Sequence, residues 1–203
     1  MRFTIVLTFI LPLFTLVRAA PVLTERDATS NSVASAVPIT STLASRVSAI
    51  IARVEADPLT TLSVYTGDGG NEYNIQTQLE SAFGAALSGI ESLPSLPKST
   101  NPSQTILNDY GPLVKVVTSS LLYSLIDLKL LSQAVIDLPE YTAFTQSLDA
   151  NSFAYTKALD AQYTGLVDEL ATAVGANPPL GEALKSIGGE TFYLLFDHIS
   201  ATK

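Results

Sequence analysis

Residues 112–138 read PLVKVVTSSLLYSLIDLKLLSQAVIDL and decide the fold class of this chain. Apolar residues recur along them every three or four positions, which is typical of one face of an α-helix. That face holds Val114, Val117, Leu121, Leu125 and Leu128. A second apolar face holds Val116, Tyr123 and Leu130. An apolar surface of this breadth predicts a helix buried on several sides, at the centre of a bundle.

The rest of the chain repeats this helical pattern between Gly and Pro residues that end or interrupt helices. We expect helices over residues 42–57 (resuming after Pro58), 72–91, 103–110, 151–174 and 180–199, with a proline-rich loop at 93–102. We find no series of short alternating strands. The sequence therefore predicts an all-α fold, an antiparallel bundle of five or six helices.

The N-terminus has the pattern of an export signal. Arg2 precedes an apolar run over residues 3–17, and small residues follow at a spacing that favours cleavage after Ala19. Residues 20–41 are rich in Ser, Thr and Ala, which favours a flexible leader. We thus predict a signal peptide over 1–19, a leader over 20–41 and a helical-bundle domain over 42–203. The expected location is extracellular, either free or attached to a cell wall.

Composition excludes several classes of function. The chain has 203 residues, a formal charge of −8 and no basic run, so a nucleic-acid partner is not expected. It has no Cys and a single His, His198, which argues against disulfides, zinc sites and a Ser–His–acid triad. Asp160 and Asp168 share a helix face, but a solvated acidic stripe explains them. We expect no enzyme activity, no cofactor, no metal and no transmembrane segment.

Hydrophobic binding is the function class that remains. A bundle of amphipathic helices can hold an acyl chain between its helices, because ligand pockets are mostly apolar with a few polar groups at the head group. Ser120 and Ser124 lie on the long helix where they could bond such a head group. The alternative is a fully packed core with these serines facing solvent. Periodicity alone favours that packed core.

Three stretches are similar to the fungal hydrophobic surface-binding protein A family, which includes cell-wall galactomannoproteins. They are the segment from Val47-x-x-Ile50 through Leu62-x-x-Tyr65 to Gly67, the segment LVKVVTSSL at 113–121, and LDAQY at 159–163 with Leu166 and Leu170 after it. The resemblance implies a secreted or wall-associated helical bundle that adsorbs to hydrophobic surfaces. The resemblance also implies binding of fatty acids such as arachidonic acid, which some relatives enclose and which is linked to virulence in them. It brings no catalytic residues.

With this resemblance, we predict a non-enzymatic extracellular protein that binds a long-chain fatty acid or another lipid inside the bundle. The residues expected around the acyl chain are Val117, Leu121, Leu125, Leu159, Tyr163, Leu166, Leu170, Phe192 and Phe196, with Ser120 or Ser124 at the head group. The alternative is a coating protein with a solid core, which adsorbs to hydrophobic surfaces through an exposed patch.

Overall fold

The protein folds as a bundle of helices, seen in a computed structural model that describes residues 4–56, 75–96, 101–135 and 139–187, with side chains described for those from Arg26 onward except 132–143. All regular structure in these ranges is helical. The helices are α1 (Thr4–Ala56), α3 (Ile75–Glu91), α4 (Gln104–Asp109), α5 (Gly111–Val116), the π-helical turn η2 (Val117–Leu121), α6 (Leu122–Val135), α7 (Pro139–Gln162), α8 (Leu166–Gly175) and α9 (Pro178–Ile187). The predicted all-α bundle is confirmed.

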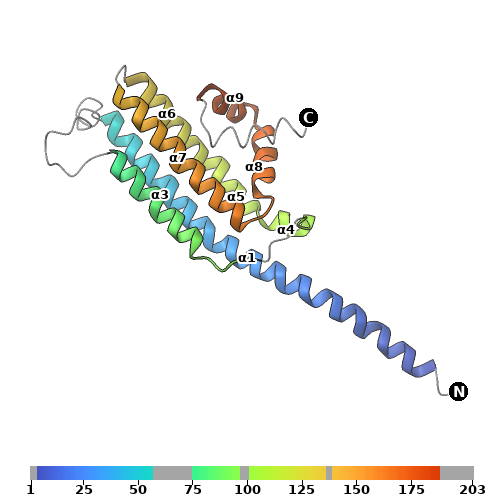
Figure 1. The fold of residues 1–203 in the computed structure, drawn as a ribbon. Helices are drawn as coiled ribbons and strands as arrows, with labels where there is room; N and C mark the ends of the chain where they lie inside the picture. The colour runs from blue at the N-terminus through green and yellow to red at the C-terminus, as the bar shows by residue number, and fades with distance from the viewer. Residues whose placement is uncertain (1–3, 57–74, 97–100, 136–138, 188–203) are drawn as a thin grey trace.

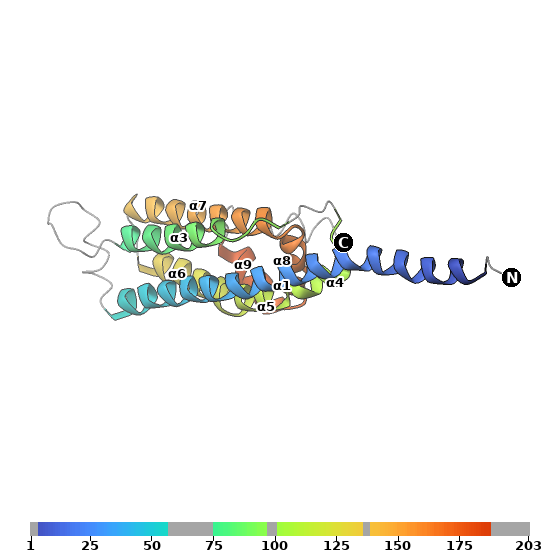
Figure 2. The same ribbon diagram turned by 90° about the horizontal axis from the view of Figure 1, so that it is seen from below.

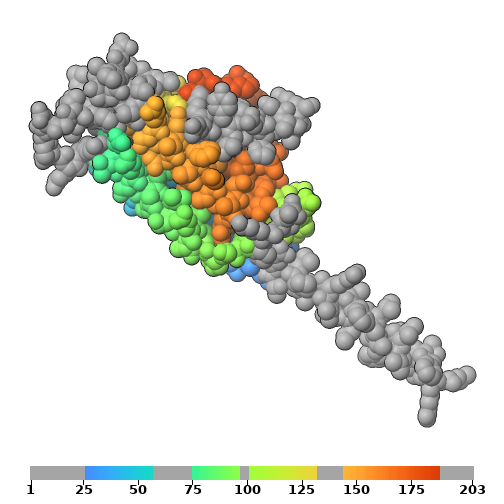
Figure 3. Space-filling model, viewed as in Figure 1, coloured from blue at the N-terminus to red at the C-terminus, as the bar shows by residue number. Residues whose placement is uncertain are grey.

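Four long helical segments form the body of the bundle (Figures 1 and 2). They are α1, α3, α7 and the continuous segment made of α5, η2 and α6. α1 packs on α3 and on the α5–α6 segment, and α3 also packs on α7, beside which it lies in Figure 3. α1 and α5–α6 run in one direction, whereas α3 and α7 run in the other (Figure 1). The shorter α8 and α9 pack against α5, η2 and α6.

The prediction of a flexible leader over 20–41 is wrong, because α1 continues without interruption through this range. Its buried side chains recur at alternating spacings of four and three residues, the pattern of a helix with one buried seam. This seam is formed by Thr29, Val33, Ala36, Thr40, Leu43, Val47, Ile50 and Val54, and Ser32 and Ala44 are buried beside it. The helical-bundle domain therefore begins well before residue 42.

Several hydroxyl groups of this Ser/Thr-rich segment are bonded to carbonyls of the same helix. Thr40 Oγ1 donates to the Ala36 carbonyl at 2.9 Å, and Thr42 Oγ1 donates to the Pro38 carbonyl at 2.8 Å. Ser35 and Ser45 donate to the carbonyls four residues before them in the same way. Thr40 is buried, so its bond to the Ala36 carbonyl satisfies its hydroxyl inside the bundle, whereas Ser35, Thr42 and Ser45 are exposed.

The N-terminal part of α1 projects beyond the other helices (Figures 1 and 2). Residues Arg26–Ala56 are long and apolar enough, by length and composition, to cross a membrane. The buried seam of this segment lies inside the bundle, and 33% of its apolar window is buried there, so core packing accounts for part of its apolar character.

The long central helix is confirmed as one continuous helical segment, with a π turn that we did not predict. Thr118 Oγ1 donates to the Val114 carbonyl at 2.8 Å, and Ser119 Oγ donates to the Lys115 carbonyl at 2.6 Å, at the start of this turn. A π turn adds a residue to the helical turn and rotates the faces that follow. Residues 136–138 of the predicted helix lie outside the described residues.

The predicted single helix over 151–174 is instead two helices, α7 and α8. The break falls at Gly165, whose φ of +85° is left-handed. A Cβ atom there would lie 3.2 Å from Leu107 Cδ2, so both the backbone angle and the space favour glycine. The break turns α8 across the α5–α6 segment instead of extending α7.

The remaining predictions agree with the structure where it describes them. α3 carries the stripe expected for 72–91, and α4 occupies the short helix expected after Ser103. Ser103 stands at the N-cap position, but its side chain makes no capping hydrogen bond. α9 is the first part of the helix expected over 180–199. The restart after Pro58 and residues 188–199 lie outside the described residues.

Candidate functional site: a groove between α1 and α3

The structure places the predicted acyl-chain residues in the packed core. Those that it describes are at most 4% exposed and belong to one continuous apolar cluster: Val117, Leu121, Leu125, Leu159, Tyr163, Leu166 and Leu170. The structure therefore brings them together in the core. They line neither of the two grooves described below. Phe192 and Phe196 lie outside the described residues.

The two serines predicted near the head group differ in their surroundings. Ser124 is 9% exposed, and its Oγ lies 2.9 Å from Ser48 Oγ on α1. That contact joins α6 to α1, so the Ser124 hydroxyl is bonded to another residue of the protein. Ser120 is half-buried in the π turn.

Two buried tyrosines join the C-terminal end of α7 to α1. The Tyr155 hydroxyl lies 2.8 Å from Thr40 Oγ1, and the Tyr163 hydroxyl donates to the Ser32 carbonyl at 3.0 Å. Burial raises the pKa of Tyr155 to about 12, although its bond to Thr40 acts in the opposite direction. Burial also raises the pKa of Tyr163, opposed by its bond to the Ser32 side chain. Both hydroxyls are therefore neutral donors with a structural partner.

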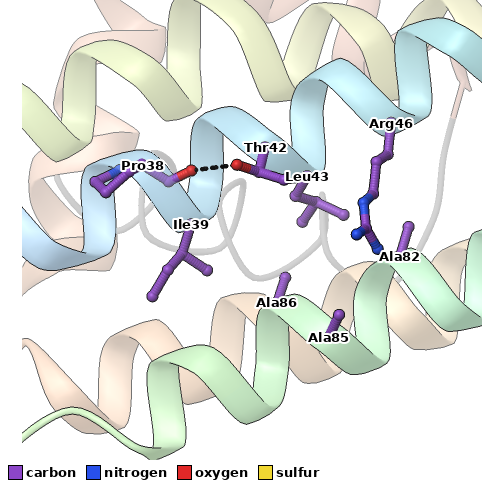
Figure 4. Close-up of a pocket in the computed structure, with 8 residues that line it drawn as sticks. All are labelled: Pro38, Ile39, Thr42, Leu43, Arg46, Ala82, Ala85 and Ala86. Atoms are coloured by element: carbon purple, nitrogen blue, oxygen red, sulfur yellow. Dashed lines mark hydrogen bonds between the residues drawn. The ribbon is translucent and has the colours of Figure 1, made fainter.

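An apolar groove lies between α1 and α3 (Figure 4). Its volume is about 270 Å³. α1 contributes Pro38, Ile39, Thr42, Leu43 and Arg46, and α3 contributes Ala82, Ala85 and Ala86. The Thr42 hydroxyl donates its proton to the Pro38 carbonyl, so it does not offer that proton to a ligand. We call this the apolar section of the groove.

A second section of about 400 Å³ continues along the same two helices beyond Arg46. Its lining is Arg46, Ala49, Ile50, Arg53, Thr77, Gln78 and Ser81. Arg46 lines both sections, so it marks their junction. We call this the polar section, because it adds the Gln78 amide, the hydroxyls of Thr77 and Ser81 and a second guanidinium, that of Arg53.

Residue size explains why a groove forms at this seam. A Cβ atom on Gly89 would lie 3.2 Å from Ile39 Cδ1, so the two helices meet closely there. Further along α3, alanine side chains face α1 (Figure 4). Alanines leave space between helices that larger side chains would fill, and α1 supplies only one long apolar side chain per turn on this side.

This groove was not predicted from the sequence. A signal was present on α1, since Ile39, Leu43, Arg46, Ile50 and Arg53 follow one another at helical spacing. The predicted leader over 20–41 contains Pro38 and Ile39, so the prediction places neither residue in a helix.

A separate exposed apolar surface lies on α6. Tyr123 is 39% exposed and Leu130 is 42% exposed, seven residues further along the same face. The Tyr123 hydroxyl accepts a hydrogen bond from Asn177 Nδ2 at 3.3 Å. Tyr123 and Leu130 lie on the second apolar face of the long helix. The sequence predicted that this face is buried, whereas both residues are exposed.

Within the described residues, no group of three or more His, Cys, Asp or Glu side chains is placed to hold a metal ion. His198 lies outside those residues. We found no family model, no curated protein and no solved structure that matches this chain.

Proposed function

We propose that the protein is a secreted, non-enzymatic lipid-binding protein, with the acyl chain of a long-chain fatty acid in the apolar section of the α1–α3 groove. The supporting observation is this groove itself, which is lined by Ile39, Leu43 and three alanines. Burial of apolar chain surface stabilises such a complex by about 0.8 kcal/mol per methylene, before entropy losses. The site differs from the interior site that the sequence predicted, because those residues pack against one another.

The length of the apolar section suits one acyl chain. From Pro38 to Arg46, α1 rises by about 12 Å, at about 1.5 Å per residue. A single acyl chain spans about 15 Å, half of the ~30 Å hydrocarbon core of a bilayer. We therefore expect affinity to rise with chain length and to level off once the chain is longer than the section.

Secretion is part of the proposal. Cleavage after Ala19 would remove residues from the part of α1 that projects beyond the other helices (Figure 1). The buried seam begins at Thr29, so it would stay intact in the shortened chain. We also propose membership of the hydrophobic surface-binding protein A family on the residues given above.

The experiment is titration of the chain starting at Ala20 with hexadecanoic acid, read by native mass spectrometry. We expect one bound fatty acid per chain. Ala85→Leu should reduce the bound fraction, because a larger side chain at this exposed position fills the groove. Ala154→Leu makes the same change at an exposed position of α7 that lines neither groove section, and should bind normally. A chain that stays free of lipid at all concentrations would contradict the proposal.

A second candidate function is adsorption to hydrophobic surfaces, as in the alternative that the sequence left open. The exposed Tyr123 and Leu130 on α6 favour it. Adsorption to polystyrene or an oil droplet should fall in Leu130→Ser and remain in Ala85→Leu. The opposite pattern would place adsorption at the α1–α3 groove.

A further inference from the structure

We infer that Arg46 binds the carboxylate of the fatty acid, so that the acyl chain runs from Arg46 toward Pro38. This inference rests on the proposed function and adds the class of head group and the direction of the chain. Arg46 stands where the apolar section meets the polar section. Its side chain extends from α1 toward Ala82 on α3, across the groove (Figure 4).

The charge of the groove favours an anion. The chain as a whole carries a formal charge of −8, with 19 acidic and 11 basic residues. The residues that line the two sections nevertheless include Arg46 and Arg53 and no carboxylate. A lining with cations and no acid attracts a negatively charged head group in a protein that otherwise repels it.

Arg46 is the guanidinium that is available to a ligand. Arg53 donates to Gln78 Oε1 at 2.8 Å, a contact between α1 and α3 that engages it within the protein. No described residue forms a hydrogen bond or an ion pair with the Arg46 side chain. A guanidinium presents parallel N–H donors that match the two oxygens of a carboxylate.

The order of residues along α1 sets the direction of the ligand. On one side of Arg46 are Leu43 and Ile39, which suit the acyl chain. On the other side are Gln78 and Thr77 from α3, which suit water around an ionised head group. A reversed ligand would place its carboxylate against Ile39 and Pro38, where the lining offers no donor. A charge without a partner in an apolar site is costly.

The size of the effect follows from exposure. Arg46 is exposed, and an exposed ion pair is screened by solvent. A charge-assisted hydrogen bond with a favourable geometry adds to the binding free energy of this ion pair. We expect the Arg46 contact to change affinity by roughly three- to tenfold, with chain burial supplying the rest.

The experiment compares hexadecanoic acid with its methyl ester, which has the same chain and no charge, on wild type, Arg46→Gln and Lys115→Gln. Lys115 is an exposed cation on α5 that lines neither section, so its variant controls for net charge. Wild type and Lys115→Gln should bind the acid more tightly than the ester, by roughly three- to tenfold. Arg46→Gln should bind both ligands equally, at the affinity of wild type for the ester. Raising the salt concentration should weaken only the binding of the acid.

Three results would overturn the inference. If Arg46→Gln binds the acid as well as wild type does, the carboxylate does not contact Arg46, and the proposed function stands. If Arg46→Gln weakens acid and ester equally, Arg46 acts through its methylene groups and not through its charge. If wild type binds neither ligand, the proposed function fails together with this inference. Circular dichroism of each variant shows that the bundle has folded.

Discussion

The Tyr155 hydroxyl on α7 lies 2.8 Å from Thr40 Oγ1 on α1, and both residues are buried. Thr40 gives its own hydroxyl proton to the Ala36 carbonyl at 2.9 Å. The Tyr155 hydroxyl is therefore the donor and Thr40 Oγ1 the acceptor. Two helices that lie far apart in the sequence thus share a buried contact, and the tyrosine must be neutral to make it.

Tyr155→Phe should lower stability by about 1 kcal/mol, since it removes one buried hydrogen bond and keeps the ring. The ring also packs edge-on against Phe83, with centroids 6.2 Å apart, and that contact should persist. Urea unfolding followed by circular dichroism measures the change. An unchanged midpoint would show that the contact with Thr40 contributes nothing.

The burial of Tyr155 predicts a loss of stability at alkaline pH. The pKa of Tyr155 is raised to about 12 in the folded state, above its ordinary value of 10. The contribution of the neutral hydroxyl is then complete below pH 10 and is lost as the pH rises from about 10 to 12. A shift of this size corresponds to about 2 to 3 kcal/mol. Wild type should lose more stability than Tyr155→Phe over this range; equal losses would contradict the assignment.

Ala36→Leu should destabilise the protein by about 1 to 3 kcal/mol, because a side chain that is 0% exposed has no room to grow. Ala34→Leu makes the same change at an exposed position of the same helix and should be nearly neutral. Thermal unfolding compares the two. If both variants matched wild type, residues 20–41 would behave as the leader that the sequence suggested.

Much of the bundle could be predicted from sequence, because its seams are made of large apolar residues. The stripe of Ile75, Leu79, Phe83 and Ile90 on α3 is an example, since each of these is buried. The first half of α1 could not be predicted in this way. Its seam includes Thr29, Ala36 and Thr40, which are small or polar and give no strong apolar stripe, and the Thr40 hydroxyl is satisfied in the core by the Ala36 carbonyl and Tyr155.

Gly165→Ala should lower stability by roughly 1 to 2 kcal/mol, because φ there is +85° and the new methyl group meets Leu107 and Pro102. Gly175→Ala is the matched variant, since a Cβ there has nothing within 4 Å. Its stability should be equal to wild type or slightly higher. Chemical unfolding of both variants tests the prediction, and equal effects would remove the case for a left-handed break between α7 and α8.

Lys129 and Asp149 form an ion pair between α6 and α7, with Nζ 2.8 Å from Oδ1 and side chains 6% and 21% exposed. Asp149→Leu should cost about 3 kcal/mol or more, because it leaves a buried ammonium without this partner. Lys129→Met together with Asp149→Leu should regain most of that loss. A double variant no more stable than Asp149→Leu alone would show that the pair is worth more than the desolvation of its charges.

The candidate site was harder to predict than the fold. The predicted residues, such as Leu121 and Leu159, were correctly assigned to inward faces, but inward faces pack against one another and need not enclose a ligand. The groove depends instead on small side chains. Ala82, Ala85 and Ala86 leave space on α3, and this space is a groove only because α1 lies beside it. Small side chains of this kind produce no periodic pattern in a single sequence, so the groove could not be predicted from it.

The most direct test of the account uses a fatty acid with a nitroxide at the end of its chain, added to protein with labelled methyl groups. We predict that NMR signals of Ile39 and Ala86 broaden first, because these residues line the apolar section away from Arg46, where the end of the acyl chain lies (Figure 4). Signals of Leu121 and Leu170 should broaden less, since these residues lie in the core and line neither section. Broadening centred on the core leucines, or on none of these residues, would contradict a ligand between α1 and α3.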